Sequence, residues 1–127
     1  MKKLLLLLFS ILISFNSYGE WTKINVDTEG STHYIDTDTV KKHGGYVYYW
    51  KLIDRLKPTN NGIMSDKTYH QGDCGVNRFN FLSYIWYKQP MGLGSGETHN
   101  PSDPEWSYPA PNSMGGITLH YACDYVK

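Results

Sequence analysis

The two cysteines are the residues of this chain whose chemistry depends most directly on their surroundings. Cys74 and Cys123 lie 49 residues apart in a chain of 127 residues, and only four residues follow Cys123. Such a pair could form a disulfide, stay reduced in a core, or exchange thiols with a partner. The CxxC spacing that typifies thiol exchange is absent, so the redox state of the compartment decides between the first two.

The N-terminus predicts that compartment. Lys2 and Lys3 precede a run of 12 residues that is apolar except for two serines, and the small residues Ser17 and Gly19 follow. This pattern is typical of a secretory signal peptide, whereas a transmembrane helix needs about 20 apolar residues. We therefore expect a signal peptide at residues 1–19 and one domain at residues 20–127. No cysteine stands at the cleavage point to carry a lipid, so we expect no membrane anchor after cleavage. We expect the mature protein in the periplasm, at the cell surface or outside the cell.

An oxidising compartment favours a disulfide between Cys74 and Cys123. Closing a loop of this length restricts the unfolded chain and stabilises the fold by roughly 4 kcal/mol. Such a bond would hold a C-terminal segment that would otherwise fray. Two buried reduced cysteines remain the alternative interpretation.

The charge of the exported domain argues against two classes of partner. Removal of the leader leaves ten lysines and arginines against twelve carboxylates, a formal charge of −2. A nucleic acid or an anionic membrane would require a basic surface, so neither is expected as a partner.

The residue types of catalytic and metal sites are present, but their spacing is not. No HExxH motif, GxSxG motif, phosphate-binding glycine loop or calcium loop occurs, and Asp36 and Asp38 are better explained as turn residues. The five histidines are scattered along the chain: His33, His43, His70, His99 and His120. We predict no catalytic residue, no metal and no cofactor, and a small hydrolase is the weakest interpretation.

Period-two alternation predicts a sheet. Five or more runs at hairpin spacing indicate one antiparallel sheet of about five or six strands, with runs at 21–26, 33–35, 46–54, 65–73 and 78–87. Alternation in 46–54 places Tyr46, Tyr48, Trp50 and Leu52 on one face and Val47, Tyr49 and Ile53 on the other, with Lys51 among them. In 78–87 it places Phe79, Phe81, Ile85 and Tyr87 opposite Leu82, Tyr84 and Trp86. A strand that is apolar on both faces belongs near the middle of a sheet.

The C-terminal third is less regular. Residues 89–112 contain most of the prolines and many glycines, so we expect a loop or ragged edge there. Residues 113–126 fit both helical spacing and alternation. Ser113 is a competent N-cap, but Gly115 and Gly116 each cost a helix about 1 kcal/mol relative to alanine. This segment favours a helix, with a strand as the alternative.

Four stretches in order carry a family resemblance. They are "HYIDTDTV", "YVYYWKLID", "SDKTYHQGDC" and "YPAPNSMGGITLHYACDYVK". Over about residues 20 to 127, the chain resembles the surface-adhesin protein E family of Gram-negative bacteria. The resemblance implies an α+β fold, in which a C-terminal helix packs on the concave face of the sheet and is tethered by the disulfide. It also implies a homodimer.

The function implied by the resemblance is binding to host extracellular matrix or serum proteins such as vitronectin and laminin. The matching segment runs from residue 65 towards residue 84, and its candidate binding residues are Lys67, Tyr69, His70 and Arg78. Asp66 and Asp73 make this segment less basic than the family pattern. The alternatives are that these are ordinary solvated strand residues and that the protein is a periplasmic envelope accessory without a host ligand.

Aromatic content suggests where binding would occur. Eleven tyrosines and four tryptophans exceed what one sheet face can bury under one helix. Some of these rings are expected on the other face or at an interface, where the ring packs while its polar tip stays hydrated.

Overall fold

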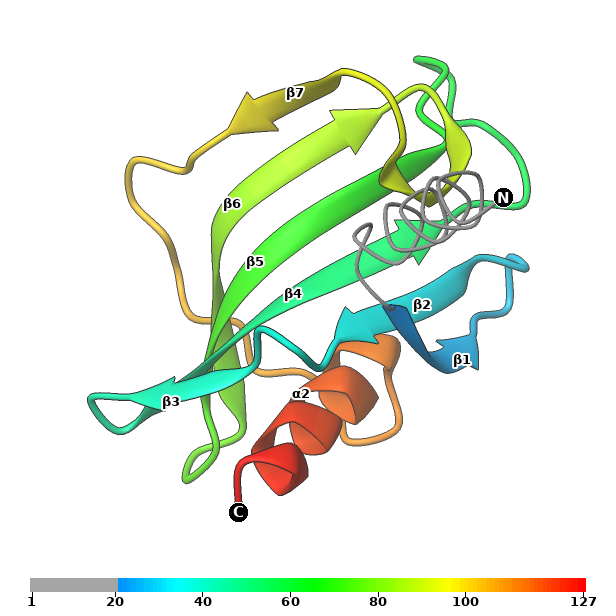
Figure 1. Cartoon of the computed structure of the whole chain (residues 1–127). Coiled ribbons are helices and arrows are strands. Elements are labelled where there is room, and N and C mark those ends of the chain that lie inside the picture. Colours follow the sequence, from blue (N-terminus) through cyan, green and yellow to red (C-terminus); the bar gives the residue numbers. More distant parts are fainter. Residues whose placement is uncertain (1–20) are drawn as a thin grey trace, which may run out of the picture.

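The computed structural model describes residues 21–127, which form one antiparallel sheet and one long helix (Figure 1). The predicted signal peptide, residues 1–19, lies outside the described residues. The strands are β1 (Trp21–Val26), β2 (Thr32–Asp36), β3 (Lys41–His43), β4 (Tyr46–Asp54), β5 (Ser65–Asp73), β6 (Arg78–Tyr87) and β7 (Gly96–His99). The helical segments are the short 3-10 helix η2 (Pro90–Gly92) and the α-helix α2 (Met114–Tyr125).

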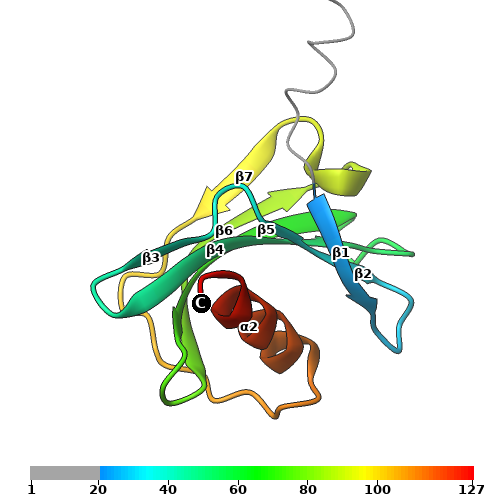
Figure 2. The same ribbon diagram turned by 60° about the horizontal axis from the view of Figure 1, so that its bottom comes forward.

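The sheet curves around α2. Its strand order is β1, β2, β4, β5, β6, β7, and every pairing is antiparallel. β3 pairs with the start of β4, and β2 pairs with the end of β4 on the same edge. Figure 2 shows α2 lying under the concave face, while η2 lies on the convex side. The fold class predicted from the sequence, α+β with one antiparallel sheet and a C-terminal helix on one face, is confirmed.

Two of the seven strands lie in stretches for which the sequence pattern indicates no strand. β3 lies in the stretch 36–45, and β7 lies in the stretch 89–112. Every residue of both strands is exposed. Neither therefore carries the alternation of buried and exposed side chains by which a strand is recognised in a sequence.

β4 occupies the middle of the sheet, as its two apolar faces predict. Val47 and Tyr49 point to the concave face, where they are 1% and 0% exposed. Tyr46, Tyr48 and Trp50 point to the convex face and are half-buried. The two faces of this strand thus carry rings in very different surroundings.

The grouping that strict alternation predicts for residues 78–87 is wrong. The register between β5 and β6 shifts once, at Leu82, which has no partner in β5. A bulge of this kind inserts one residue and reverses the direction of all later side chains. As a result Phe79, Phe81, Tyr84 and Trp86 share the concave face, whereas Ile85 and Tyr87 share the convex face.

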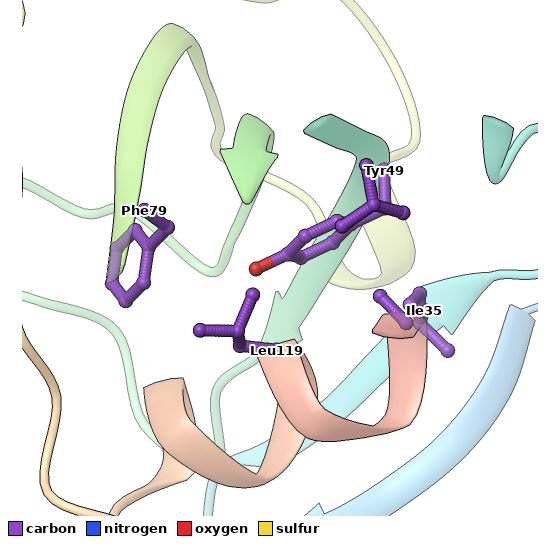
Figure 3. Close-up of a cluster of buried hydrophobic side chains, with 6 residues drawn as sticks. Ile35, Tyr49, Phe79 and Leu119 are labelled. Carbon is purple, nitrogen blue, oxygen red and sulfur yellow. The ribbon is translucent and has the colours of Figure 1, made fainter. Parts of the chain in front are cut away.

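The hydrophobic core lies between the concave face and α2. Figure 3 shows Leu119 of α2 beneath the ring of Tyr49, with Ile35 and Phe79 on either side. All four are buried, and Val47 and Ala122 complete the cluster. Gly72 of β5 makes this approach possible, since a Cβ there would lie 2.6 Å from Leu119 Cδ1.

The helix interpretation of the last segment is confirmed, and its two glycines have a packing reason. Ser113 is the N-cap, and its Oγ accepts a hydrogen bond from the N–H of Gly116 at 3.1 Å. A Cβ at Gly116 would overlap the carbonyl oxygen of Ala110, and one at Gly115 would lie 3.3 Å from Phe79. The helix thus loses intrinsic propensity but packs closely against the loop before it.

The predicted disulfide is confirmed. Cys74 directly follows β5, Cys123 lies in the last turn of α2, and their Cα atoms are 5.8 Å apart. The bond therefore ties the C-terminal end of the helix to the hairpin between β5 and β6. The alternative of two reduced cysteines is excluded.

Candidate binding surface

Tyrosine and tryptophan rings gather on the convex face of the sheet, away from α2. The ring of Tyr69 on β5 lies 4.8 Å from that of Trp50 and 6.1 Å from that of Tyr48, both on β4. The hydroxyl of Tyr48 accepts a hydrogen bond from Gln71 Nε2 at 3.0 Å. Antiparallel pairing brings these rings together because side chains directly opposite in two strands share a face.

Lys67 lies at one end of this group, between two more rings. Its Nζ is 5.1 Å from the ring centre of Tyr87 and 5.8 Å from that of Trp21. Within residues 21–127 it forms no ion pair shorter than 4.0 Å with a carboxylate. Its positive charge is therefore held against aromatic faces and remains available to a ligand.

Arg78 lies at the other end. Its guanidinium carbon is 4.0 Å from the ring centre of Trp106, which in turn lies 5.6 Å from Tyr46. Arg78 Nε donates a hydrogen bond to Asp73 Oδ2 at 3.0 Å. Hydrogen bonds to the Tyr108 hydroxyl and to the Asp73 carboxylate raise the pKa of Arg78 above its usual value. The guanidinium is thus oriented and charged at this end of the surface.

These residues define what we call the convex aromatic surface. It consists of Trp21, Tyr46, Tyr48, Trp50, Lys67, Tyr69, Arg78 and Trp106. Aromatic rings and arginine are the side chains most enriched at the energetic centres of protein interfaces. Its chemistry therefore suits the binding of another protein.

Three of the four predicted binding residues lie on this surface, and His70 does not. His70 points to the concave face, is 2% exposed, and lies 4.8 Å from the ring of Tyr49. Its Nε2 is 2.7 Å from Thr68 Oγ1. Burial lowers the pKa of His70 to about 3, so the imidazole is neutral. Neighbouring residues of a strand point to opposite faces, which separates His70 from Tyr69.

Sequence reasoning missed most of the rings. Alternation already placed Tyr46, Tyr48 and Trp50 on one face, but nothing in the sequence showed that α2 leaves this face uncovered. No sequence pattern pointed to Trp106, because it lies in a proline-rich loop that only the fold brings against Arg78.

A group of charged side chains occupies the concave face beyond α2. His33 Nε2 lies 2.8 Å from Asp27 Oδ2, and Arg55 Nη2 lies 2.9 Å from Asp66 Oδ1. Lys51 is 5% exposed, and burial lowers its pKa to about 8 against the opposing effect of Asp66 and Asp27. We call these five residues the concave charged cluster.

Burial also shifts the pKa of two other members of this cluster. It raises the pKa of Asp66, against the effect of the Arg55 charge, and lowers the pKa of His33, against its hydrogen bond with Asp27. Within residues 21–127, no three His, Cys, Asp or Glu side chains lie where they could hold a metal ion. We therefore interpret the cluster as charged side chains that compensate one another within the fold.

A comparison with protein-family models identifies the family. The model of surface-adhesin protein E matches residues 21–124. The chain belongs to the surface-adhesin protein E family. Family membership indicates an adhesin-like, exported protein and points away from an enzyme.

Solved structures of protein E from Haemophilus influenzae have the same fold. Crystal form II is 12% identical in sequence, with a TM-score of 0.61, and the match covers 82% of this chain and 87% of that one. The structure from a non-typeable strain is also 12% identical, with a TM-score of 0.59 and coverage of 84% and 80%. At this identity the likeness shows a shared fold.

Two further searches gave no positive result. A search of curated protein sequences gave no match. Within residues 21–127, no helix has the length and hydropathy needed to span a membrane.

Proposed function

We propose that this protein is an exported, non-enzymatic adhesin that binds another protein through the convex aromatic surface. The partners proposed are host extracellular matrix or serum proteins, with vitronectin and laminin as the first to test. Lys67, Tyr69 and Arg78 are the proposed binding residues. His70 is left out because it is buried on the concave face beside Tyr49.

One observation supports this proposal above the others. Lys67 and Arg78 stand at the two ends of a row of half-buried rings, on the sheet face that α2 does not cover. Rings of this kind lose little conformational entropy on binding and bury a large area. A face with this composition therefore suits a specific protein contact.

The two cations should act partly at long range. The described domain has a small net charge, so attraction to an acidic partner would come from these local charges. Such attraction is screened over about 8 Å at physiological ionic strength. Binding is therefore expected to weaken as salt is added.

The test compares two double variants with the unsubstituted protein. Lys67→Ala with Arg78→Ala removes both cations of the surface, whereas Lys42→Ala with Lys57→Ala removes two exposed lysines elsewhere. Binding to immobilised vitronectin and laminin is measured at low and physiological salt. We expect saturable binding that the first pair of substitutions weakens and the second leaves unchanged.

Two results would contradict the proposal in different ways. Absence of saturable binding by the unsubstituted protein at either salt concentration would favour the periplasmic accessory without a host ligand. Equal binding by both double variants would keep the adhesin function but move it off this surface.

Self-association is part of the same proposal. A homodimer would form through the convex aromatic surface or through the outer edges of β1 and β7, which end the sheet. Sedimentation at several concentrations tests it. A mass equal to one chain throughout would exclude the dimer.

A further inference from the structure

A hollow of about 280 Å³ opens on the convex face beside β1 and β2. Its walls include three aromatic rings and three polar side chains: Trp21, Trp50, Tyr87, Asp36, Thr39 and Lys67. This volume lies at the lower end of ligand pockets, which span roughly 300 to 1,000 Å³. The hollow therefore suits a small ring rather than an extended molecule.

The polar groups of the hollow are held in place. Asp36 lies opposite Trp21 in the pairing of β1 and β2. Its carboxylate accepts hydrogen bonds from Thr39 Oγ1 at 3.0 Å and from the N–H of Asp38 at 3.1 Å. A carboxylate has about four acceptor positions, so it can still accept from a ligand. Lys67 supplies up to three donors.

These walls disfavour three classes of ligand. A purely apolar molecule would remove water from Asp36 and Lys67 without replacing their hydrogen bonds. A cation would be repelled by the Lys67 ammonium, which lies 5.8 Å and 5.1 Å from the ring centres of Trp21 and Tyr87. An anion would meet the Asp36 carboxylate. A neutral molecule with one apolar face and several hydroxyl groups avoids all three penalties.

We propose that this hollow binds one pyranose ring of a saccharide. The C–H groups on one face of a pyranose would lie against an indole of Trp21 or Trp50, whose ring face carries partial negative charge. Adjacent hydroxyl groups would donate to Asp36 and accept from Lys67. This saccharide site shares Trp21, Trp50 and Lys67 with the convex aromatic surface, but it also uses Asp36 and Thr39, which lie outside that surface, and it does not use Arg78 or Trp106.

The four tryptophans of the chain allow a direct test. Each gives one indole N–H signal in a ¹⁵N-correlated NMR spectrum: Trp21, Trp50, Trp86 and Trp106. Trp21 and Trp50 line the hollow, whereas Trp86 lies on the concave face and Trp106 beside Arg78. The probes are the methyl glycosides of glucose, galactose, mannose, N-acetylglucosamine and glucuronic acid, each added to millimolar concentration.

We expect at least one of these glycosides to shift the signals of Trp21 and Trp50 saturably, while those of Trp86 and Trp106 stay in place. Asp36→Asn should weaken binding about tenfold, because the ligand loses a hydrogen bond to a charged group. Asp103→Asn changes an exposed carboxylate outside the hollow in the same way, so this matched control should bind unchanged. The glucuronide should bind most weakly, because its carboxylate would meet that of Asp36, and a preference for the glucuronide would overturn the neutral-saccharide proposal.

The unsubstituted protein decides the question even if a variant fails to fold. If none of the five glycosides moves the Trp21 and Trp50 signals saturably, the saccharide site is overturned. Equal shifts of all four indole signals would overturn it as well, since they would show unspecific contact. Neither result bears on binding to vitronectin or laminin, which the Lys67 and Arg78 double variant tests separately.

Discussion

The two faces of the sheet are built from the same strands but do different work. On β4, Tyr49 is fully buried against α2, whereas its neighbour Trp50 is half-buried on the convex face. On β5, His70 is likewise buried on the concave face, whereas its neighbour Tyr69 is half-buried on the convex face. The side chains on both faces are aromatic, so residue type does not separate core from surface. What separates them is α2, which covers the concave face only.

The concave face is itself divided. Its end under α2 is hydrophobic, while its other end contains the concave charged cluster of Asp27, His33, Lys51, Arg55 and Asp66. Buried charges of this kind persist where opposite charges and hydrogen bonds compensate one another. On the convex face, Lys67 lies beside two rings, and Arg78 both pairs with Asp73 and stacks on Trp106. The first face thus holds the core of the fold, and the second carries the proposed binding surface.

Removing the disulfide should have the largest effect on this contrast. Cys74→Ser with Cys123→Ser should lower the free energy of unfolding by about 4 kcal/mol, because the unfolded chain regains the freedom of a 49-residue loop. Amide hydrogens of residues 113–125 should then exchange before those of β4 and β5. Urea unfolding and hydrogen exchange provide the measurements. Equal protection of helix and sheet in the variant would show that packing alone holds α2.

A core truncation should have the next largest effect. Leu119→Ala removes the side chain that lies under Tyr49 and should cost about 3 kcal/mol, the usual range for a buried leucine. Thermal or urea unfolding measures it. A cost below about 1 kcal/mol would mean that α2 is only loosely packed on the sheet.

Acid should destabilise the fold through His70. Its pKa is about 3 in the folded state against 6.5 for the free side chain, so the unfolded state binds the proton first as the pH falls. Stability that is fully present above pH 6.5 should therefore decrease below it, by about 2 kcal/mol at pH 5. Unfolding of His70→Phe over the same pH range is the comparison. Parallel pH profiles for the two proteins would refute this effect.

Removing an aromatic ring from the convex face should have the smallest effect on stability. Tyr69→Ala removes stacking on Trp50 and Tyr48, which is worth about 1 kcal/mol, and leaves the core intact. The same change should reduce binding to vitronectin or laminin, measured alongside unfolding. If Tyr69→Ala destabilised the fold as much as Leu119→Ala, the convex face would belong to the core, and the contrast between the two faces would not hold.

Much of this architecture followed from local patterns. Alternation predicted the strands at 21–26 and 46–54, and 46–54 keeps its two predicted faces because side-chain direction in an uninterrupted strand follows from backbone geometry. The isolated cysteine pair, together with the predicted export signal, indicated the disulfide. For the binding residues, the resemblance selected a segment, and alternation could have shown that Tyr69 and His70 point to opposite faces.

Other features depended on contacts between distant residues. β3 and β7 are held by backbone pairing with β4 and β6, so their exposed side chains carried no pattern. The bulge at Leu82 reversed the faces of Tyr84 to Tyr87, because one extra residue changes register without changing composition. Trp106 reached Arg78 only through the folded loop.

The sequence by itself thus determined where the main strands lie, and it favoured the C-terminal helix over a strand and the disulfide over two reduced cysteines, because these depend on local geometry and on cysteine chemistry. Only the tertiary structure decided which face of the sheet α2 covers. That choice depends on close approach, since Leu119 can reach the sheet only where Gly72 leaves room and where Cys123 meets Cys74. It buried Tyr49 and His70 and left Trp50, Lys67 and Tyr69 on the face available for binding.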